Sequence, residues 1–567
     1  MNSIKRVLPL WIRHYPRQHL GADVLAGFVM TILVLPQSLA YAMLVGLPPQ
    51  AGLYASILPA LAYAWVGSSM TQVVGPVAIT SIMTFAMLSP LVPPSSPQYL
   101  VLTALLAFMS GLVVLAAGIL RLGFLSNLLS RPVVSGFISG SAVLILMSQT
   151  KLLLGVQAHG ASTWEQWTSA VAQLAQANHV TVMLGILAIL TLYLARRFLT
   201  SLLIRLQVPQ TVAEMTTRLA PLVVVVGGTL AVVALNLDST YGVAVVGQVQ
   251  NGLPQLALQW PSLADLNMLM FPALTLAFIG IVQNITMAQA LAMKRHERVD
   301  ANQEMVGLGV SNMVASLFGG MPVGGGLSRS AVNVASGGQT PLSSVVSAFA
   351  MLGIVLLGTS WFSRIPLPVL AASIVVAAVY MIDLAELRRA WAYDRADAFA
   401  FLGTGLGVLV FGLQLGIVVG IGLSLATLLY RAASPHIAVV GRIVGTEHFR
   451  NIERHGVETL PGVLFVRVDE SIFFGNLRAI ESRLLAELAK LPDTRALVLI
   501  MSAVNRVDLT GLEAMTEAQQ DLQGRGIEMH LAEIKGPVQD RMMNTPLWKA
   551  LAGRIHLSAN AAFEALK

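Results

Sequence analysis

The sequence predicts a polytopic α-helical membrane protein of about 14 spans, followed by a separate α/β domain at its C-terminal end. The 567 residues have a mean hydropathy of +0.73, with 55% hydrophobic and only 11% charged residues, which is far outside the soluble range. Charged residues number 32 in residues 1–434 and 31 in residues 435–567, a jump in density that marks a domain boundary near Ser434-Pro435. Residues 1–434 also divide into apolar segments near the ~20 residues that cross a bilayer.

The expected membrane spans form two repeats of seven, at about 23–236 and 265–430. They cover residues 23–44, 50–68, 76–89, 98–120, 132–150, 180–199, 219–236, 271–292, 302–318, 328–339, 341–359, 366–381, 397–411 and 412–430. An odd repeat inserts the second time upside down, so the pattern favours an inverted-repeat transporter.

Basic residues set the expected orientation. Of the 20 Lys and Arg in residues 1–434, 17 lie in the N-terminal tail or in connections on one side of the membrane, whereas Lys151 and Arg364 lie on the other. The remaining one, Arg329, lies within the membrane. By the positive-inside rule we expect both termini to be cytosolic, and the start of the chain shows no cleavable-signal pattern. We also expect a multi-pass protein of the plasma (inner) membrane.

Two of the expected spans are short, and each begins where glycine or proline interrupts the helical pattern. Each is the third span of its repeat of seven, so the two interruptions occupy corresponding positions. The first break is Val74-Gly75-Pro76-Val77, before span 76–89, and the second is the Gly-rich run 319–326, before span 328–339. Five glycines and a proline in eight residues cannot continue a helix. We therefore expect extended chain there, with two half-helix N-termini facing each other at mid-membrane.

Arg329 follows the second break, where an unpaired charge in a membrane costs at least ~2.5 kcal/mol. We expect Ser328 to cap the second half-helix, whose positive dipole end lies beside Arg329. Both features attract an anion. The alternative is a cytosolic turn whose arginine faces water.

The expected spans offer Arg329 no counter-ion. Four acids lie at or near predicted span ends, where carboxylates cost little: Asp23, Asp265, Glu304 and Asp383. A bound anion is then the natural partner of the arginine.

Polar side chains also occur within two apolar spans. Gln37 and Tyr41 follow Pro36 and lie one helical turn apart on one face. Either the two side chains line a cavity, or the helix is merely kinked and the Gln37 amide forms a hydrogen bond with a neighbouring helix. Gln283-Asn284 and Thr286 likewise serve either a site or helix–helix contact.

The C-terminal part, residues 435–567, is typical of a soluble α/β domain. Segments 463–468, 496–500 and 527–531 are expected strands, and 477–490 and 511–522 are expected amphipathic helices. Thr510, in Asp508-Leu509-Thr510-Gly511, is expected to cap the second helix rather than to be phosphorylated.

Several classes of function are disfavoured. The chain has no cysteine, which excludes disulfides and thiol metal sites, and it shows no P-loop and no metal-ligand spacing, so we expect no metal or cofactor. The pI near 9.7 reflects basic loops between apolar spans, so nucleic-acid binding is not expected. We expect neither enzyme activity nor a catalytic residue.

Several segments together resemble the SulP anion permeases, the family that includes prestin and pendrin, over nearly the whole chain. The segments are Leu35–Ala42, Gly46–Tyr54, Asn302-Gln303-Glu304, Phe318–Pro322 and Ser328–Asn333. The tail is similar to the family's STAS domain, with Asp508–Gly511 at the loop that is phosphorylated in the related antagonists.

The resemblance implies a core and a gate domain, commonly a homodimer, that move small inorganic anions by an elevator-like motion, with protein partners possible through the STAS domain. The implied site residues are Gln37, Tyr41, Gly75, Pro76, Val77, Ala78, Ser328, Arg329 and Ser330. The family usually has a carboxylate on span 8 where this chain has Gln283, and a nearby lysine where it has Gln289.

The favoured function is therefore secondary transport of a small oxyanion, sulfate first. The alternatives are a bicarbonate, chloride or dicarboxylate transporter or exchanger, an anion channel or voltage-responsive motor, and a membrane-anchored signalling protein that works through its STAS tail.

Overall fold

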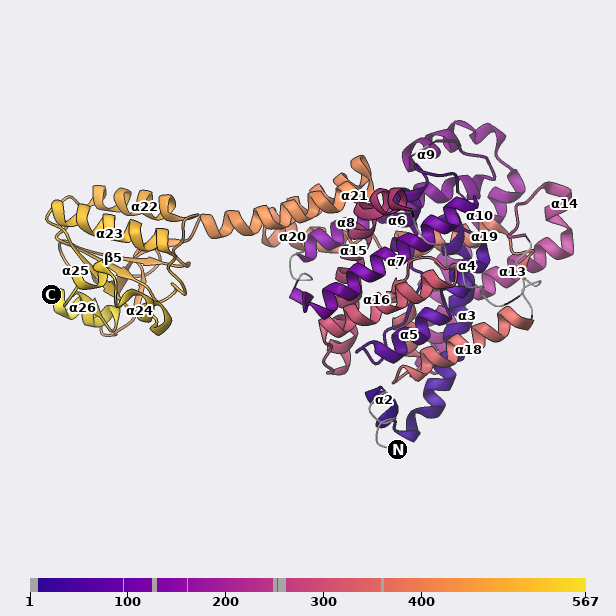
Figure 1. Ribbon diagram of the computed structural model, residues 1–567, viewed down its shortest axis with the longest axis horizontal. Coiled ribbons are helices and arrows are strands. Elements are labelled where there is room, and N and C mark those ends of the chain that lie inside the picture. The colour runs from indigo at the N-terminus through magenta and orange to yellow at the C-terminus, as the bar shows by residue number, and fades with distance from the viewer. Residues whose placement is uncertain are drawn as a thin grey trace. The chain divides into compact units, whose positions relative to one another are not determined.

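The computed structural model describes residues 9–94, 96–124, 130–160, 162–247, 252, 262–357 and 362–567. The chain forms two compact units, Met1–Ser424 and Leu425–Lys567, and the division between them along the sequence falls within the long helix α21 (Arg395–Ala433) (Figure 1). The boundary expected near Ser434-Pro435 lies just past the end of this helix.

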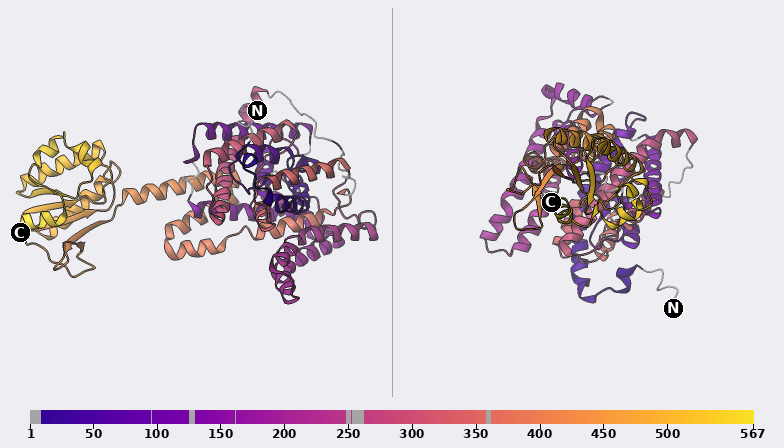
Figure 2. Two further views of the ribbon diagram at one scale, coloured as in Figure 1. Left: turned by 90° about the horizontal axis from the view of Figure 1, so that it is seen from below. Right: turned by 90° about the vertical axis from the view of Figure 1, so that its left-hand side faces the viewer.

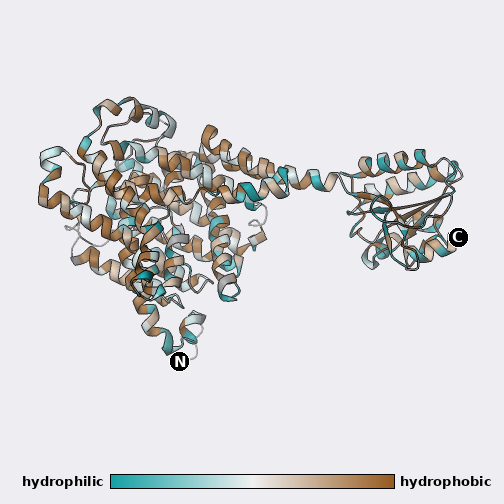
Figure 3. Cartoon of the chain, turned by 180° about the vertical axis from the view of Figure 1, so that it is seen from behind, coloured by the Kyte–Doolittle hydropathy of each residue, from teal (hydrophilic) through white to brown (hydrophobic). Residues whose placement is uncertain are grey.

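The first unit is almost entirely helical. Its principal helices are α3 (Leu20–Val45), α4 (Pro49–Tyr54), α5 (Leu58–Val66), α6 (Ala78–Leu88), α7 (Pro97–Ile119), α8 (Arg131–Leu154), α9 (Thr163–Ala172), α10 (His179–Leu194), α11 (Thr200–Arg205), α12 (Gln210–Arg218), α13 (Ala220–Leu235), α14 (Leu237–Tyr241), α15 (Leu263–Arg295), α16 (Ala301–Leu317), α17 (Leu327–Ala335), α18 (Leu342–Leu357), α19 (Leu367–Val379) and α20 (Leu384–Tyr393). Apolar residues dominate these helices (Figure 3).

Eight helical segments of the described chain are long and apolar enough to cross a membrane. They are Arg17–Val45, Pro97–Ile119, Arg131–Leu154, His179–Arg205, Leu263–Met293, Leu367–Tyr393, Arg395–Leu413 and Leu415–Ala433. The last two segments are consecutive parts of α21, and Gly412, whose φ of 81° interrupts this helix, lies one residue before the end of the first, at the junction expected between spans 397–411 and 412–430.

Among the expected spans, 50–68 and 271–292 show how the observed helices differ. Span 50–68 is divided between α4 and α5. Helix α15 begins at Leu263, ahead of the expected start at 271, because Ser262 and Asp265 form a capping box in which the Ser262 hydroxyl accepts from the Asp265 N–H at 3.1 Å. The polar capping residues precede the apolar run, so hydropathy placed the start too late.

Small residues let the helices approach closely. On the α7–α16 contact, a Cβ on Gly309 would lie 2.8 Å from the carbonyl oxygen of Gly111, and one on Gly118 would lie 2.9 Å from that of Asn302. A Cβ on Gly136 of α8 would collide with the Phe401 carbonyl of α21. Such approaches are typical of packing between membrane helices, where larger side chains would separate the backbones.

Helix contacts divide the first unit into two groups. Helices α3, α5, α6, α7 and α15–α18 pack mainly on one another and form the first group, and α8, α10, α13 and α19 form the second. The two groups contact each other at a few places. Helix α3 of the first group packs on α13 and α19 of the second, and α6 of the first packs on α8 of the second.

The second unit contains a six-stranded sheet in the order β4-β3-β5-β6-β7-β8. Figure 2 shows the strands of this unit together with its helices. The strands are β3 (Ile437–Arg442), β4 (Phe449–Asn451), β5 (Val463–Val468), β6 (Ala496–Ile500), β7 (Glu528–Ala532) and β8 (Ile555–His556). Strands β5 to β8 are parallel, and β3 is antiparallel to both of its neighbours. The three strands expected from sequence are present, with the last shifted by one residue.

Helices cover both faces of this sheet. Helices α22 (Leu477–Lys490), α23 (Leu509–Gly524), α24 (Gly536–Met542) and α25 (Pro546–Ala550) share a core with one set of strand residues, and α26 (Ala559–Leu566) shares a core with the other. The alternation along β5, with Leu464 and Val466 in one core and Phe465 in the other, follows from the two-residue period of a strand.

The expected cap of α23 was wrong. Asp508 is the N-cap, and its carboxylate accepts from the Gly511 N–H at 2.7 Å, while Thr510 lies inside the first turn. Asp508 also accepts from the Phe474 N–H at 3.1 Å, which ties the helix start to a second loop.

One pair of histidines joins the last two strands. The rings of His530 and His556 stack with centroids 5.3 Å apart, and Nδ1 of the first lies 3.0 Å from Nε2 of the second. Burial lowers the pKa of both histidines below the ordinary value near 6.5, although Glu528, 3.5 Å from His530, opposes this. We call these two residues the histidine pair.

Candidate functional site

The two sequence breaks lie against each other in the first unit. Residues Val74–Gly75 form the short strand β1, which pairs antiparallel with β2 (Gly324–Gly325), so that Val74 opposes Gly325. Gly326 adds a further bond, from its N–H to the carbonyl of Val73 at 3.1 Å. Extended backbone at this depth needs such partners because lipid supplies none. Each strand is followed at once by a short helix, α6 or α17.

Side chains complete the hydrogen bonding of the breaks. The amide of Asn312, on α16, both accepts from the Val323 N–H at 2.9 Å and donates to the Val323 carbonyl at 3.0 Å. The hydroxyl of Ser330 accepts from the Val73 N–H at 2.9 Å. Ser330 is fully buried, so its first effect is to hold the two breaks together.

Neither half-helix is capped by a side chain. Helix α17 begins at Leu327 with Gly326 as its N-cap, so the N-cap role expected for Ser328 was wrong. Helix α6 begins at Ala78 with Val77 as its N-cap, again without a capping side chain. The first-turn N–H groups of both helices therefore lack the usual side-chain acceptor and are available to an anion.

Arg329 is buried between the breaks, with only 4% of its surface exposed. Within the described part of the chain its guanidinium makes no hydrogen bond or ion pair, and the buried Nη2 has no partner. Nη1 lies so close to Gly75 that a Cβ there would collide with it. The ring of Tyr41 lies 5.9 Å from the guanidinium carbon. A buried cation with an unpartnered donor indicates a place for an anion.

The remaining sequence candidates surround this arginine to different degrees. The amide of Gln283, on α15, donates to the Gly325 carbonyl at 3.4 Å, and its buried Oε1 has no partner among the described residues. Pro76 is buried next to β1. Gln37 lies one turn before Tyr41 on α3 and is half-buried, but among the described residues it forms no hydrogen bond with the arginine.

A buried carboxylate behind the breaks was misjudged from the sequence. Glu304 was expected at an inexpensive span end, but it is fully buried one turn into α16. It accepts from the Tyr63 hydroxyl at 2.6 Å, from the N–H groups of Ser68 and Ser69 at 2.9 Å each, and from the Ser68 hydroxyl at 2.8 Å.

Two amides connect this carboxylate to the breaks. Asn284 donates to Glu304 at 3.1 Å and accepts from Gln72, which lies two residues before β1. A Cβ on Gly325 would lie 2.8 Å from the Asn284 oxygen, so this chain of polar groups passes directly behind β2. Sequence reasoning noted Asn284 but missed Gln72 entirely.

Asp23 was likewise expected at or near a span end, where a carboxylate costs little. It is fully buried, and its carboxylate accepts from the N–H groups of Gln339 and Thr340 at 2.6 and 3.1 Å and from the Thr340 hydroxyl at 2.7 Å. The residue therefore fastens the start of α3 to the turn between α17 and α18. Thr286, by contrast, is exposed, so it does not contribute to the buried polar cluster.

Comparison with known proteins gives two family matches. Residues 20–404 match the model described as the sulfate permease family, and residues 456–562 match the STAS domain. A probable sulfate transporter of Mycobacterium tuberculosis is 32% identical over 539 residues, covering 94% of this chain and 92% of that protein. The chloroplastic sulfate transporter 4.1 of Arabidopsis thaliana is 32% identical over 542 residues, covering 92% and 76%.

Solved structures with similar folds include murine Solute Carrier 26 family member A9, an anion transporter captured in the inward-facing state. Its TM-score is 0.88 at 22% identity, covering all of this chain and 94% of that one. The transmembrane domain of a cyanobacterial bicarbonate transporter has a TM-score of 0.61 at 23% identity, covering 72% and 98%. At these identities the likeness concerns the fold.

Proposed function

The chain belongs to the sulfate permease family and carries a C-terminal STAS domain, and from this premise we propose that it transports sulfate through a site between the two breaks. The family consists of transporters rather than enzymes. The observation that supports the proposed site is the buried guanidinium of Arg329, which has an unpartnered Nη2 beside two uncapped half-helix starts.

The proposed site offers three kinds of donor to an oxyanion. The first-turn N–H groups of α6, from Ala78, approach from one side, and those of α17, from Leu327 and Ser328, approach from the other. Arg329 adds a planar fork that suits two oxygens of one anion. The glycine at position 75 matters because only a residue without a Cβ lets the guanidinium lie against β1.

We assign supporting roles to the other candidates. Tyr41 borders the guanidinium with its ring, and Gln37 extends the same face of α3. Pro76 and Val77 hold the first break extended up to the start of α6, and Ser330 holds it against the second break. Gln283 completes the wall beside β2, where its unpartnered oxygen faces no donor of the described chain.

The proposed mechanism is alternating access of an elevator type. The helix group that contains α3, α6, α15 and α17 carries the site and forms the core, and the group that contains α8, α10, α13 and α19 forms the gate. The polar chain from Glu304 through Asn284 to Gln72 supports this division, because it ties both breaks to α15 and α16. We further propose a homodimer in the plasma (inner) membrane, with cytosolic termini and protein partners at the STAS domain.

The coupling that we propose is exchange or facilitated movement driven by the gradient of the anion. Gln283 cannot titrate, and the buried Glu304 already accepts five hydrogen bonds from its surroundings. Neither residue therefore offers a vacant carboxylate to a proton or Na⁺ at the breaks. Bicarbonate, chloride and dicarboxylates remain alternative substrates, since each suits a guanidinium between two helix N-termini.

Uptake of radiolabelled sulfate by the purified protein in proteoliposomes tests the proposal. We expect saturable uptake that is accelerated by unlabelled sulfate inside, as an alternating-access carrier requires. Competition by bicarbonate, chloride and a dicarboxylate ranks the substrates, and imposed pH and Na⁺ gradients test the coupling. Currents that rise linearly with driving force, without counterflow, would favour an anion channel, and the absence of any anion flux would refute transport.

A further inference from the structure

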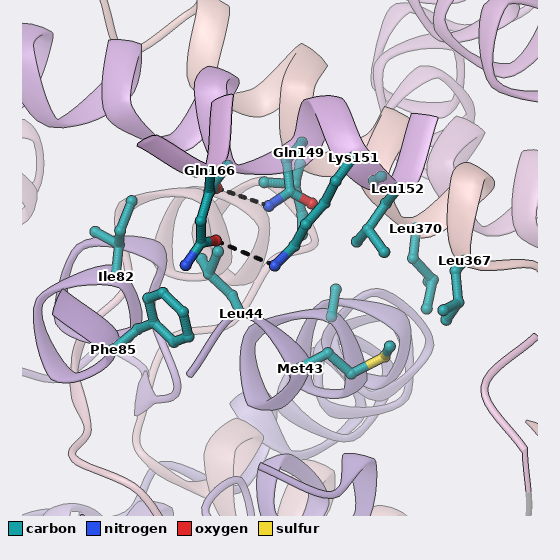
Figure 4. Close-up of a pocket in the computed structure, with 14 residues that line it drawn as sticks. Met43, Leu44, Ile82, Phe85, Gln149, Lys151, Leu152, Gln166, Leu367 and Leu370 are labelled. Atoms are coloured by element: carbon teal, nitrogen blue, oxygen red, sulfur yellow. Dashed lines mark hydrogen bonds between the residues drawn. The ribbon is translucent and has the colours of Figure 1, made fainter. Parts of the chain in front are cut away.

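A second polar cluster lies at a cavity between the two helix groups. The cavity measures about 50 Å³ and is lined from one side by α3 and α6 and from the other by α8 and α19 (Figure 4). At about 10–15 Å³ per water by this measure, it holds a few waters or one small oxyanion without its hydration shell. Its polar lining comes from α8 and from Gln166, on α9, and the rest is apolar.

Lys151 is the cation of this cavity. Its ammonium donates to the neutral Gln166 oxygen at 3.2 Å, and no carboxylate of the described residues forms an ion pair with it. The other half of the Gln166 amide donates to the Gly160 carbonyl at 3.1 Å, which orients its oxygen toward the ammonium. An ammonium has three donors, so this neutral contact leaves capacity for an anion.

Gln149 supplies a second, independent sign of a ligand position. This residue is only 2% exposed, lines the cavity, and has a buried Oε1 without a partner in the described chain. Its Nε2 donates to the neighbouring Ser148 hydroxyl at 3.0 Å. A half-turn of the amide would present its N–H groups to the cavity instead. Buried amides are normally satisfied on both sides, so the orphaned oxygen marks a missing partner.

The cavity lies next to the candidate site along two helices. On α3, Met43 and Leu44 follow Tyr41 within one turn, and on α6, Ile82 and Phe85 lie four and seven residues after Ala78. At 1.5 Å per residue along a helix, Ile82 and Phe85 are about 6 and 10 Å from the start of α6. An anion that leaves the breaks toward the end of α8 therefore meets this cavity next, past the apolar side chains.

From this placement we propose that the cavity is a second anion-binding site, in which Lys151 and Gln149 hold a small oxyanion on its way to or from the breaks. The inference rests on the proposed transport function. It assigns a role to Lys151, one of only two basic residues expected on its side of the membrane, where a positive charge raises the local anion concentration.

The test is sulfate uptake by the full chain in proteoliposomes, at several sulfate concentrations and at low and high ionic strength. Lys151→Gln removes the charge, and we expect KM to rise about tenfold at low salt with kcat unchanged, because the site at the breaks is intact. The advantage of the wild type should shrink at high salt. Lys151→Arg should stay close to the wild type, as should Arg364→Gln, which removes an exposed charge expected on the same side.

The absence of cysteine in the chain allows a second measurement on a single variant. Lys151→Cys, modified with aminoethyl methanethiosulfonate, regains a cation of lysine-like length and should regain the low KM. Modification with the negatively charged sulfonatoethyl reagent should raise KM further. If both reagents act alike, the charge at this position is irrelevant and the proposal is overturned.

The outcomes separate this inference from the proposed function. Wild-type protein that moves no anion refutes both. Wild-type transport that needs Arg329, combined with unchanged KM and unchanged salt dependence in Lys151→Gln, refutes only the second site.

Discussion

Replacing Arg329 by methionine separates the cost of burying a charge from its use. Arg329 is 4% exposed and its guanidinium has no hydrogen bond or ion pair within the described residues, so the substitution removes no such partner there. Methionine fills a similar volume, and an unpaired buried charge is unfavourable. We therefore expect the melting temperature of the ligand-free protein to stay the same or to rise.

The effect on sulfate binding should be large. One unit charge at about 4 Å from another, at an effective dielectric of about 20, contributes about 4 kcal/mol. At 1.4 kcal/mol per factor of ten, loss of this term weakens binding about 10³-fold. Arg329→Lys keeps the charge but loses the two-pronged geometry, for which we expect a loss of about tenfold.

The assay is a thermal melt of the purified protein with and without sulfate. A ligand at a hundred times its Kd stabilises the folded state by about 2.7 kcal/mol, so sulfate should raise the melting temperature of the wild type. The same concentration should not shift Arg329→Met. Arg364→Met, which removes an exposed arginine, is the matched control. A well-folded Arg329→Met that keeps the full sulfate shift would refute the assignment of Arg329.

Three further predictions concern other parts of the chain. Gly75→Ala should displace the guanidinium and weaken sulfate binding at least about tenfold, whereas Gly227→Ala, with open space around it, should not. Gln283→Glu adds a negative charge beside β2, so its sulfate affinity should be low at pH 7.5 and recover as the carboxylate protonates on acidification. Residues 435–567 expressed alone should melt cooperatively. Because burial lowers the pKa of the histidine pair, its stabilising contribution is complete above pH 6.5 and is lost as pH falls, so this fragment should melt lower at pH 5.5 than at pH 7.5.

Each of these three predictions has an outcome that would contradict it. Equal sulfate affinity in the two glycine variants would show that the guanidinium tolerates a methyl group at β1. A pH-independent affinity in the glutamate variant would place Gln283 away from the bound anion. A fragment that is insoluble over several starting residues, or equally stable at both pH values, would contradict the domain prediction or the role of the histidine pair.

Local sequence determined the helix breaks but not their partners. Glycine and proline disfavour a helix locally where they are clustered or stand at the end of an apolar run, so the breaks before α6 and α17 and the span junction at Gly412 could be located in advance. The pairing of β1 with β2 joins residues about 250 positions apart, and only the inverted-repeat argument suggested it.

The positions of two acidic residues were misjudged, because the free-energy cost of burying a carboxylate depends on hydrogen-bond donors that the sequence does not reveal. Glu304 and Asp23 lie near helix starts, where water usually solvates a carboxylate, yet both are buried against N–H groups and hydroxyls supplied from distant segments. The prediction of the N-cap of α23 was wrong for a simpler reason. Both Asp508 and Thr510 are good capping residues, and only the backbone conformation selects between positions two residues apart.

The missing counter-ion of Arg329 also has an electrical consequence for the proposed cycle. With sulfate bound, the arginine and its ligand carry one net negative charge, and without it the arginine carries one positive charge. Inward movement of the loaded site and outward return of the empty site would then both be opposed by an interior-negative potential, at up to about 2.3 kcal/mol per charge for each 100 mV. A monovalent anion would leave the loaded site neutral and confine the voltage dependence to the return step. The steepness of transport against membrane potential therefore reports the valence of the anion that the site carries.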